Sequence, residues 1–237
     1  MNNRKIAFGF LLILIASFGA YAQQDSEKDF ETELVDGGKS VSIAYYTGKN
    51  ANIRIPQRIN NLPVTVIGEG AFMDSKLSGV AIPNGVTVIE SYAFSDNNIA
   101  GVAIPNSVVS IEEKAFFRNK IANLTIPASV KSIGKEAFAV NNLGNVTIPP
   151  GVTLIGDRAF AWNKLTNITI PASVTVIEGE AFIGNSITRI TIGENVDFKY
   201  EAASQEGPFD GGFANFYNSN RRRAGTYTYV SGRWSVN

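Results

Sequence analysis

The sequence predicts a mainly β solenoid, in which coils stack along one axis and share one hydrophobic core. One sequence motif, Ile-Pro followed by Val, Ile and then Ala-Phe, repeats every 22 residues between Leu77 and Ile192. The Ile-Pro pairs begin at positions 82, 104, 126, 148 and 170, and the Ala-Phe pairs at positions 71, 93, 115, 137, 159 and 181. Because a unit this short cannot bury its apolar face alone, we expect each coil to bury it on its neighbours.

Each coil is predicted to carry two extended segments. The first, such as 121–126, has apolar residues at its first, fourth and sixth positions, which is the L-x-x-L-x-L core of a leucine-rich repeat. The alternation of Leu124 and Ile126 favours a strand, and stacked copies form a parallel sheet that ends at the proline. The second, such as 130–133, is rich in β-branched residues and is therefore predicted to be extended rather than helical. The predicted fold is a leucine-rich repeat solenoid, capped at both ends.

Two columns of identical residues are predicted to lie along the stack. The phenylalanines of the Ala-Phe pairs form the first column, in which each ring packs on the next coil. The second column is Asn97, Asn119, Asn141, Asn163 and Asn185, with Ser75 in the first copy. Asparagine tolerates left-handed backbone and bonds to neighbouring main chain, so this column predicts a corner of the coil rather than a binding site.

These repeats resemble the BspA-like leucine-rich repeats of bacterial surface proteins, and residues 213–234 are similar to the C-terminal segment found with them. The resemblance covers residues 35–234. The chain differs from it in having Asn where many such repeats carry Cys, and Gly193 where a further Ile-Pro is expected. The second difference predicts the end of regular coiling. The resemblance implies binding to other macromolecules, as in adhesion to host proteins or other bacteria.

Five parts are predicted along the chain. They are a signal peptide at 1–22, a flexible acidic lead-in at 23–34, an N-terminal capping hairpin with the first strand at 35–56, the solenoid at 57–196, and an aromatic C-terminal cap at 197–237. The hairpin is expected because the turn formers at 36–38 precede an alternation of apolar and polar residues. The first Ile-Pro pair lies 27 residues before the next, which predicts a loop insertion at 59–63.

The N-terminal segment is typical of a secretory signal peptide. Arg4 and Lys5 precede an apolar run that ends at Ala20, and Ala20-Tyr21-Ala22 forms a cleavage site. The run is shorter than the roughly 20 apolar residues of a membrane-spanning helix, although a retained anchor stays an alternative. The chain has no Cys, which excludes a lipoprotein and any disulfide. We therefore expect export to the periplasm, the cell surface or the medium, with no transmembrane segment after signal removal.

The C-terminal cap is predicted from a break in the pattern. After Val196 the repeat fails, because Lys199 falls where an apolar residue is due, and aromatic residues become frequent. Terminal coils of a solenoid differ from the others because they must seal the last core. Residues 225–229 and 231–234 read as a closing hairpin. An aromatic and arginine-rich contact site is the alternative role for this segment.

Several chemical functions are excluded by composition. The chain contains no His and no Cys, so histidine-based triads, thiol nucleophiles and the usual zinc sites are absent, and no metal or cofactor is predicted. The 21 basic and 21 acidic residues balance, and the one basic run is 221–223, which argues against nucleic acid as a partner.

The carboxylates are predicted to form surface ladders rather than an active site. Successive coils alternate in sign, as in Glu113, Lys135, Asp157 and in Lys114, Glu136, Arg158, Glu180. Stacked coils could bring Glu90 and Glu112 to the spacing of a glycosidase pair, but a convex rim offers no pocket. The protein is therefore predicted not to be an enzyme.

The predicted function is non-catalytic binding of a macromolecule, with a host matrix protein or a bacterial surface protein as partner; the oligomeric state is left open. A structural envelope protein without a dedicated ligand is the alternative. The candidate binding residues point outward from the first strands: Asn123, Thr125, Asn145, Thr147, Asn167, Thr169, Arg189 and Thr191. Small, uncharged side chains in rows give a surface that a protein can cover at low desolvation cost. Alternatively, these residues serve only β-propensity and solubility.

Overall fold

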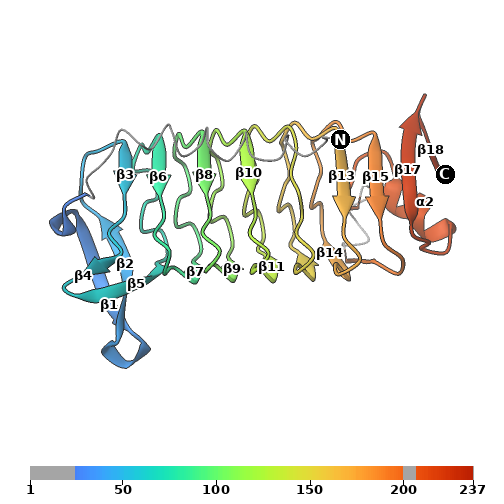
Figure 1. Cartoon of the computed structure of the whole chain (residues 1–237). Helices are drawn as coiled ribbons and strands as arrows, with labels where there is room; N and C mark the ends of the chain where they lie inside the picture. Colours follow the sequence, from blue (N-terminus) through green and yellow to red (C-terminus); the bar gives the residue numbers. More distant parts are fainter. Residues whose placement is uncertain (1–24, 200–206, 237) are drawn as a thin grey trace, which may run out of the picture.

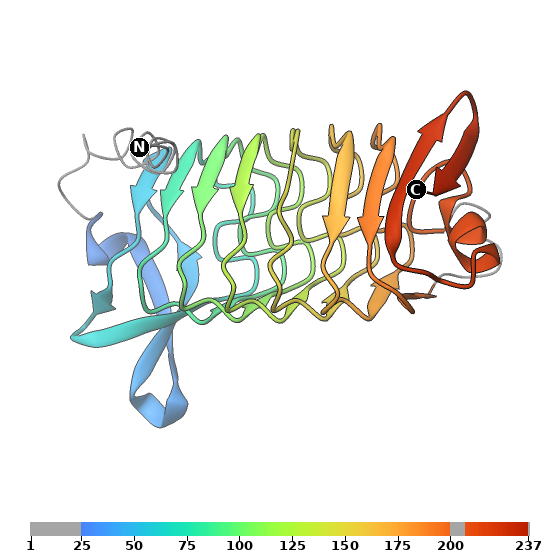
Figure 2. The same cartoon turned by 45° about the vertical axis from the view of Figure 1, so that its right-hand side comes forward.

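The computed structural model describes residues 25–199 and 207–236. The coils follow one another in a single row, with a hairpin at the N-terminal end and a helix and hairpin at the C-terminal end (Figures 1 and 2). The predicted solenoid of stacked coils with parallel sheets is confirmed. The predicted signal peptide at 1–22 lies outside the described residues.

The strands that precede the Ile-Pro pairs form one side of the solenoid, here called the Ile-Pro side. Two four-stranded sheets lie on it, in the orders β10-β8-β6-β3 and β13-β15-β17-β18. Their strands are β3 (Asn52–Arg54), β6 (Gly79–Ala81), β8 (Gly101–Ala103), β10 (Asn123–Thr125), β13 (Asn167–Ile170), β15 (Arg189–Ile192), β17 (Gly225–Val230) and β18 (Arg233–Val236). The intervening coil joins by a single parallel bridge between Thr125 and Thr147.

The opposite side carries one ten-stranded sheet. Its strands are β1 (Phe30–Val35), β2 (Ser40–Tyr46), β4 (Arg58–Ile59), β5 (Leu62–Ile67), β7 (Val88–Ile89), β9 (Ser110–Ile111), β11 (Ser132–Ile133), β12 (Leu154–Ile155), β14 (Val176–Glu178) and β16 (Asp197–Lys199). From β5 to β14 neighbouring strands pair in parallel at the repeat spacing, as Ser132 does with Ser110 and with Leu154. The prediction that this side is extended is confirmed.

The phenylalanine column is a continuous stack of buried rings. Neighbouring ring centroids from Phe72 to Phe182 lie 5.0 to 5.6 Å apart, with interplanar angles of 4° to 13°. Tyr46 continues the stack at one end, 5.5 Å from Phe72, and Phe209 continues it at the other, 4.9 Å from Phe182. Both caps therefore add an aromatic ring to the core of the repeats.

The asparagine column joins each coil to the preceding one, and we call it the Asn ladder. The side-chain oxygen of Asn141 accepts a hydrogen bond from the amide of Ile121 at 3.0 Å. Its Nδ2 donates to the carbonyl of Phe116 in the preceding coil at 3.0 Å, and to that of Phe138 in its own coil at 3.2 Å. Asn141 is 7% exposed, so these bonds replace water that cannot reach the groups.

The corner differs from the prediction in one respect. The left-handed residue of this corner precedes the asparagine, with φ of 57° at Asp96, 50° at Arg118, 57° at Val140 and 52° at Trp162. The asparagines themselves do not have positive φ. Their role is to bond neighbouring main chain, as predicted, while the residue before them makes the turn.

The predicted flexible lead-in at 23–34 is wrong from Asp25 onward. This segment contains the 3-10 helix η1 (Glu27–Asp29) and most of strand β1. The 3-10 turn η2 (Asp36–Gly38) then connects β1 to β2, and the two strands form the antiparallel hairpin at the lower left of Figure 1. Phe30 is buried, 5.4 Å from the ring of Tyr46, and the Asp25 carboxylate accepts a hydrogen bond from the amide of Arg54 at 2.6 Å. Burial of one aromatic side chain orders an otherwise polar segment.

The insertion at 59–63 is a hairpin between β4 and β5, in which Arg58 pairs with Pro63. Asn60 and Asn61 at its tip have φ of 50° and 62°. Two consecutive left-handed residues are the geometry of the two-residue turn that suits the twist of a hairpin.

Regular coiling continues beyond the predicted boundary at Val196. Strand β16 pairs in parallel with β14, and Phe198 lies opposite Ile177. That spacing is 21 residues rather than 22, so Phe198 fills the buried position that Lys199 was predicted to occupy. The predicted closing hairpin is present as β17 and β18. Helix α2 (Phe213–Ser219), which was not predicted, buries Phe213 and Tyr217 beneath this hairpin.

We expect Asn141→Ala to lower the free energy of unfolding by about 2 kcal/mol, because it leaves the buried amide of Ile121 without a partner and the carbonyl of Phe116 with only the longer hydrogen bond from Asn119, at 3.3 Å. Urea unfolding followed by circular dichroism measures the change. Asn142→Ala, at the adjacent and more exposed position, is the matched control and should stay within about 0.5 kcal/mol of wild type. Equal effects of the two substitutions would contradict a specific role for the Asn ladder.

Truncation after Val196 should give an aggregating or partly unfolded protein. It removes β16 and β17, which pair with β14 and β15, and it removes Phe209 from the exposed end of the ring stack. Size-exclusion chromatography and thermal melting measure the outcome. Phe209→Ala in the full chain tests the same contact and should cost about 3–5 kcal/mol. A soluble truncated protein with a cooperative melt would show that the segment is not a cap.

Candidate functional site

The candidate binding residues lie on the Ile-Pro side in two rows, which we call the Asn–Thr face. Each exposed pair flanks one buried residue, such as Leu124 between Asn123 and Thr125. This alternation arises because successive side chains of a strand point to opposite faces. The exposed members are Asn123, Thr125, Asn145, Thr147, Asn167 and Thr169. None of these side chains carries a charge.

Arg189 and Thr191 continue these rows on β15, where they pair with Asn167 and Thr169. Thr191 is only half-exposed, because the antiparallel strand β17 lies beside it and the hydroxyls of Thr191 and Thr226 are 3.0 Å apart. Arg189 is exposed and lies opposite Thr228. The structure thus brings all eight predicted residues onto one side, with Thr191 partly covered.

Sequence reasoning did not include the closing hairpin in this face. Thr226 and Thr228 alternate with Tyr227, whose side chain is fully buried opposite Ile190. The threonines therefore lie on the outward side of β17, next to the row formed by Thr191. The alternation of Thr and Tyr at 225–229 could have indicated that these threonines point outward. Only the pairing of β17 with β15 shows that they lie next to the Asn–Thr face.

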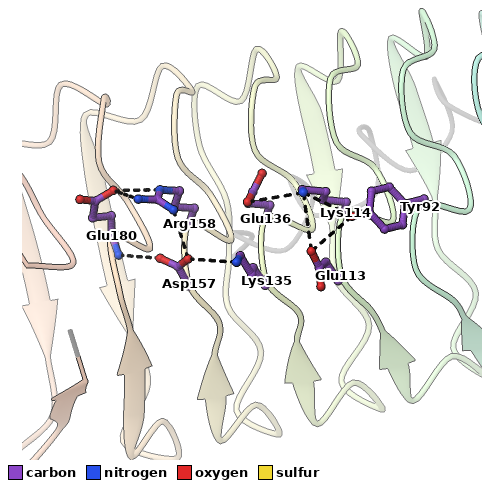
Figure 3. A network of polar contacts seen from close by, with 8 residues as sticks. All are labelled: Tyr92, Glu113, Lys114, Lys135, Glu136, Asp157, Arg158 and Glu180. Carbon is purple, nitrogen blue, oxygen red and sulfur yellow. Dashed lines mark hydrogen bonds and ion pairs between the residues drawn. The ribbon is translucent and has the colours of Figure 1, made fainter. Parts of the chain in front are cut away.

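The predicted charge ladders are present on another surface of the solenoid, where the labelled side chains of successive coils point toward one another (Figure 3). Lys114 lies 3.8 Å from Glu136, and Lys135 lies 3.9 Å from Asp157. Arg158 donates from Nε at 2.8 Å and from an Nη at 2.6 Å to one carboxylate oxygen of Glu180. These hydrogen bonds raise the pKa of Arg158. Partly exposed pairs of this kind contribute about 0–1 kcal/mol each, so the ladders are structural.

The Glu90–Glu112 pair lies beside a shallow hollow but does not line it. This hollow, of about 500 Å³, is lined by Glu69, Gly70, Met73 and Tyr92. Glu90 accepts a hydrogen bond from the amide of Glu69 at 3.0 Å. Burial raises the pKa of Glu90, with smaller contributions from neighbouring carboxylates that include Glu112.

Residues 25–199 and 207–236 contain no cluster of three or more metal-ligating side chains. Over the same residues, no helix has the length and apolar character needed to cross a bilayer.

The repeats identify the family. The model of the BspA type leucine rich repeat region matches six copies over residues 65–189, just over half of the chain. The chain therefore belongs to this family of leucine-rich repeat proteins. A comparison with curated protein sequences gave no match.

Solved bacterial structures share the fold. The T. pallidum leucine rich repeat protein is 25% identical over 71% of this chain and 81% of its own, with a TM-score of 0.65. A leucine rich cell surface protein from Faecalibacterium prausnitzii is 25% identical over 91% of this chain but only 61% of its own, with a TM-score of 0.57. The pneumococcal vaccine antigen PcpA, 21% identical over 73% of this chain and 50% of its own, shares the fold with a TM-score of 0.58.

Glu90→Gln is expected to change how stability depends on pH. Because the pKa of Glu90 is raised above 4.5 in the folded protein, folding favours the protonated carboxyl. The stability that it contributes is present below the unfolded pKa and is lost as the pH rises through the folded pKa. The unfolding free energy of wild type, relative to Glu90→Gln, should therefore fall as the pH rises through this window.

Urea titrations across the window, from about pH 4 upward, measure this difference. Glu178→Gln removes a carboxyl at the equivalent position of a later coil and is the matched control. An identical change in both variants would contradict the assignment to Glu90.

Proposed function

We propose that this protein is an exported, non-catalytic protein that binds another macromolecule through the Asn–Thr face. The partner is a protein of the host matrix or of another bacterial surface. The observation that carries the proposal is the two rows of three exposed, uncharged side chains on three consecutive coils, from Asn123 to Thr169, over a buried core.

The physical argument rests on the cost of removing water. A charged side chain loses much hydration free energy when a partner covers it, whereas an amide or a hydroxyl loses less and can bond to the partner. Neighbouring strands hold these groups about 4.8 Å apart, so the spacing of donors and acceptors is set before binding. A preorganised surface of this kind avoids the entropy cost of ordering loops on association.

Membership of the BspA-type family supports a binding role, because leucine-rich repeats present a long exposed surface. The F. prausnitzii relative is described as a cell surface protein, and we extend that location to this chain. The apolar segment that ends in Ala20-Tyr21-Ala22 supports export. The lack of His and Cys, together with the position of the Glu90–Glu112 pair outside the hollow, supports a non-catalytic role.

Thr125→Arg, Thr147→Arg and Thr169→Arg together should abolish binding to a partner found in a screen of host matrix proteins and whole bacterial cells. Three guanidinium groups on adjacent strands would have to be desolvated at the interface. Surface plasmon resonance measures the affinity. The melting transition should change little, because exposed substitutions cost within about 0.5 kcal/mol each.

The matched control is Thr153→Arg with Thr175→Arg. These exposed threonines follow Lys131 in one column of the opposite side, so the variant also places three cations on adjacent coils. It should bind as wild type does. Unaltered affinity of the first variant, or equal loss in the control, would contradict the Asn–Thr face as the site. Absence of any partner in the screen would favour a structural envelope protein.

A further inference from the structure

A second outward surface has a different chemistry. In three consecutive coils, the chain turns a corner just after the buried phenylalanine. At this corner, exposed or half-exposed side chains form two parallel rows along the solenoid. We call this surface the basic–aromatic ridge. Its residues are Arg118, Lys120, Val140, Asn142, Trp162 and Lys164. It lies outside both the Asn–Thr face and the charge ladders.

Two of the ridge residues conflict with their own backbone. Val140 and Trp162 occupy the left-handed position of the corner, with φ of 57° and 52°. Other coils place Asp74, Asp96, Arg118 or Gly184 at this position, and of these residue types Asp and Gly adopt left-handed backbone more easily. A β-branched or bulky residue with positive φ is an outlier, and such strain is concentrated at functional sites. Large apolar side chains are therefore present here despite a backbone that disfavours them.

Trp162 is held as a platform. The five-membered ring of its indole rests against Gly184 of the next coil, where an added Cβ would lie 2.4 Å from Cδ1 and 3.0 Å from Nε1 of the indole. The side chain is nevertheless 46% exposed. Gly184 thus permits the indole to lie on the surface, supported on one side and open to solvent on the other.

The charges of the ridge are positive and poorly neutralised. Arg118 lies 3.8 Å from Asp96 and 5.3 Å from the ring of Phe117. For Lys120 and Lys164, no carboxylate lies within ion-pair distance in the parts of the chain that the structure describes. This contrasts with the ladders, where each cation faces an anion of a neighbouring coil.

We propose that the basic–aromatic ridge binds an acidic polysaccharide laid along the solenoid axis. A sugar ring stacks on the open side of Trp162, because the partly positive C–H groups of the ring meet the negative face of the indole. One acidic group of the polymer pairs with Lys164, in the same coil as Trp162, and the next pairs with Lys120. These lysines are two coils apart, about 10 Å, which matches the separation of acidic groups in a polymer with a disaccharide repeat.

The shape of the ridge favours a polysaccharide over a peptide or a bilayer. The two exposed apolar side chains, Val140 and Trp162, form a small apolar area, whereas membrane binding and protein hot spots bury wide apolar surfaces. The indole also rests against Gly184 instead of projecting outward to enter a pocket or a lipid layer. A single aromatic platform at one end of a row of cations suits one sugar ring and the charged groups that follow it along the polymer.

The test uses the full chain without signal peptide and three probes: a hyaluronan octasaccharide, polygalacturonate and chondroitin sulfate. Calorimetry and tryptophan fluorescence measure binding. We expect at least one probe to bind, with an affinity that falls as salt concentration rises. Trp162→Asn should weaken that binding by about tenfold or more, equivalent to the loss of one good stacking contact. Lys164→Ala should weaken it by about threefold.

Two controls separate loss of the site from loss of the fold. Trp162→Asn introduces a residue that tolerates left-handed backbone, so its melting temperature should equal or exceed that of wild type. Lys76→Ala removes the lysine at the position equivalent to Lys120 in the first coil, where Asp74 pairs with it, and should leave affinity unchanged.

The proposal is overturned if none of the three probes binds, or if Trp162→Asn binds as wild type does. Equal affinity for hyaluronan and for its carboxyl-reduced form would also overturn it, because the acidic groups would then have no role. Binding of polyglutamate or of anionic phospholipid vesicles in place of the polysaccharides would reassign the ridge to a peptide or a membrane. Because no protein partner is present in these assays, their outcome is independent of the function of the Asn–Thr face.

Discussion

Every coil of this solenoid depends on its neighbour to satisfy its own main chain. At the corner after Phe116, the carbonyl of that residue is bonded by Asn141 of the next coil, which also accepts from the amide of Ile121. A buried main-chain group left without a partner costs about 1–3 kcal/mol, so each coil is less stable without the next one. The Asn ladder and the ring stack form together, because the same residue supplies both the aromatic ring and the carbonyl.

This dependence makes the two ends of the molecule different from its middle. Tyr46 and Phe209 extend the ring stack at either end, and antiparallel strands finish the sheets, β1 on the ten-stranded side and β17 with β18 on the Ile-Pro side. The outer strand β1 carries the exposed carboxylates Glu31 and Glu33. Charge on an edge strand disfavours further pairing, which limits the addition of a second chain.

Because the inward columns supply the stability, the outward columns can differ in chemistry at little cost. The Asn–Thr face carries no charge from Asn123 to Thr169, and the ladders neutralise themselves through pairs such as Arg158 with Glu180. On the basic–aromatic ridge, Lys120 and Lys164 have no carboxylate within ion-pair distance in the described chain. One scaffold thus presents three surfaces that are suited to different tasks. A neutral face permits close contact with a protein, whereas an unbalanced basic surface attracts an acidic polymer.

The periodic features could be predicted from the sequence alone. A constant spacing of 22 residues places equivalent residues of successive coils in contact, so the ring stack, the alternating ladders and the outward rows of Asn and Thr follow from position. The Asn ladder was recognised as a corner for the same reason. These features need no knowledge of contacts between distant and dissimilar segments.

The tertiary structure decided what lies outside the repeat. The burial of Phe30 against Tyr46, the fit of Phe198 opposite Ile177 and the return of Thr226 beside Thr191 each join segments that no period relates. The alternation of apolar and polar residues along the strands predicted which side chains point outward. It could not predict that β17 extends the Asn–Thr face or that Gly184 supports Trp162. Such contacts are set by packing between unlike neighbours, for which the sequence holds no repeated signal.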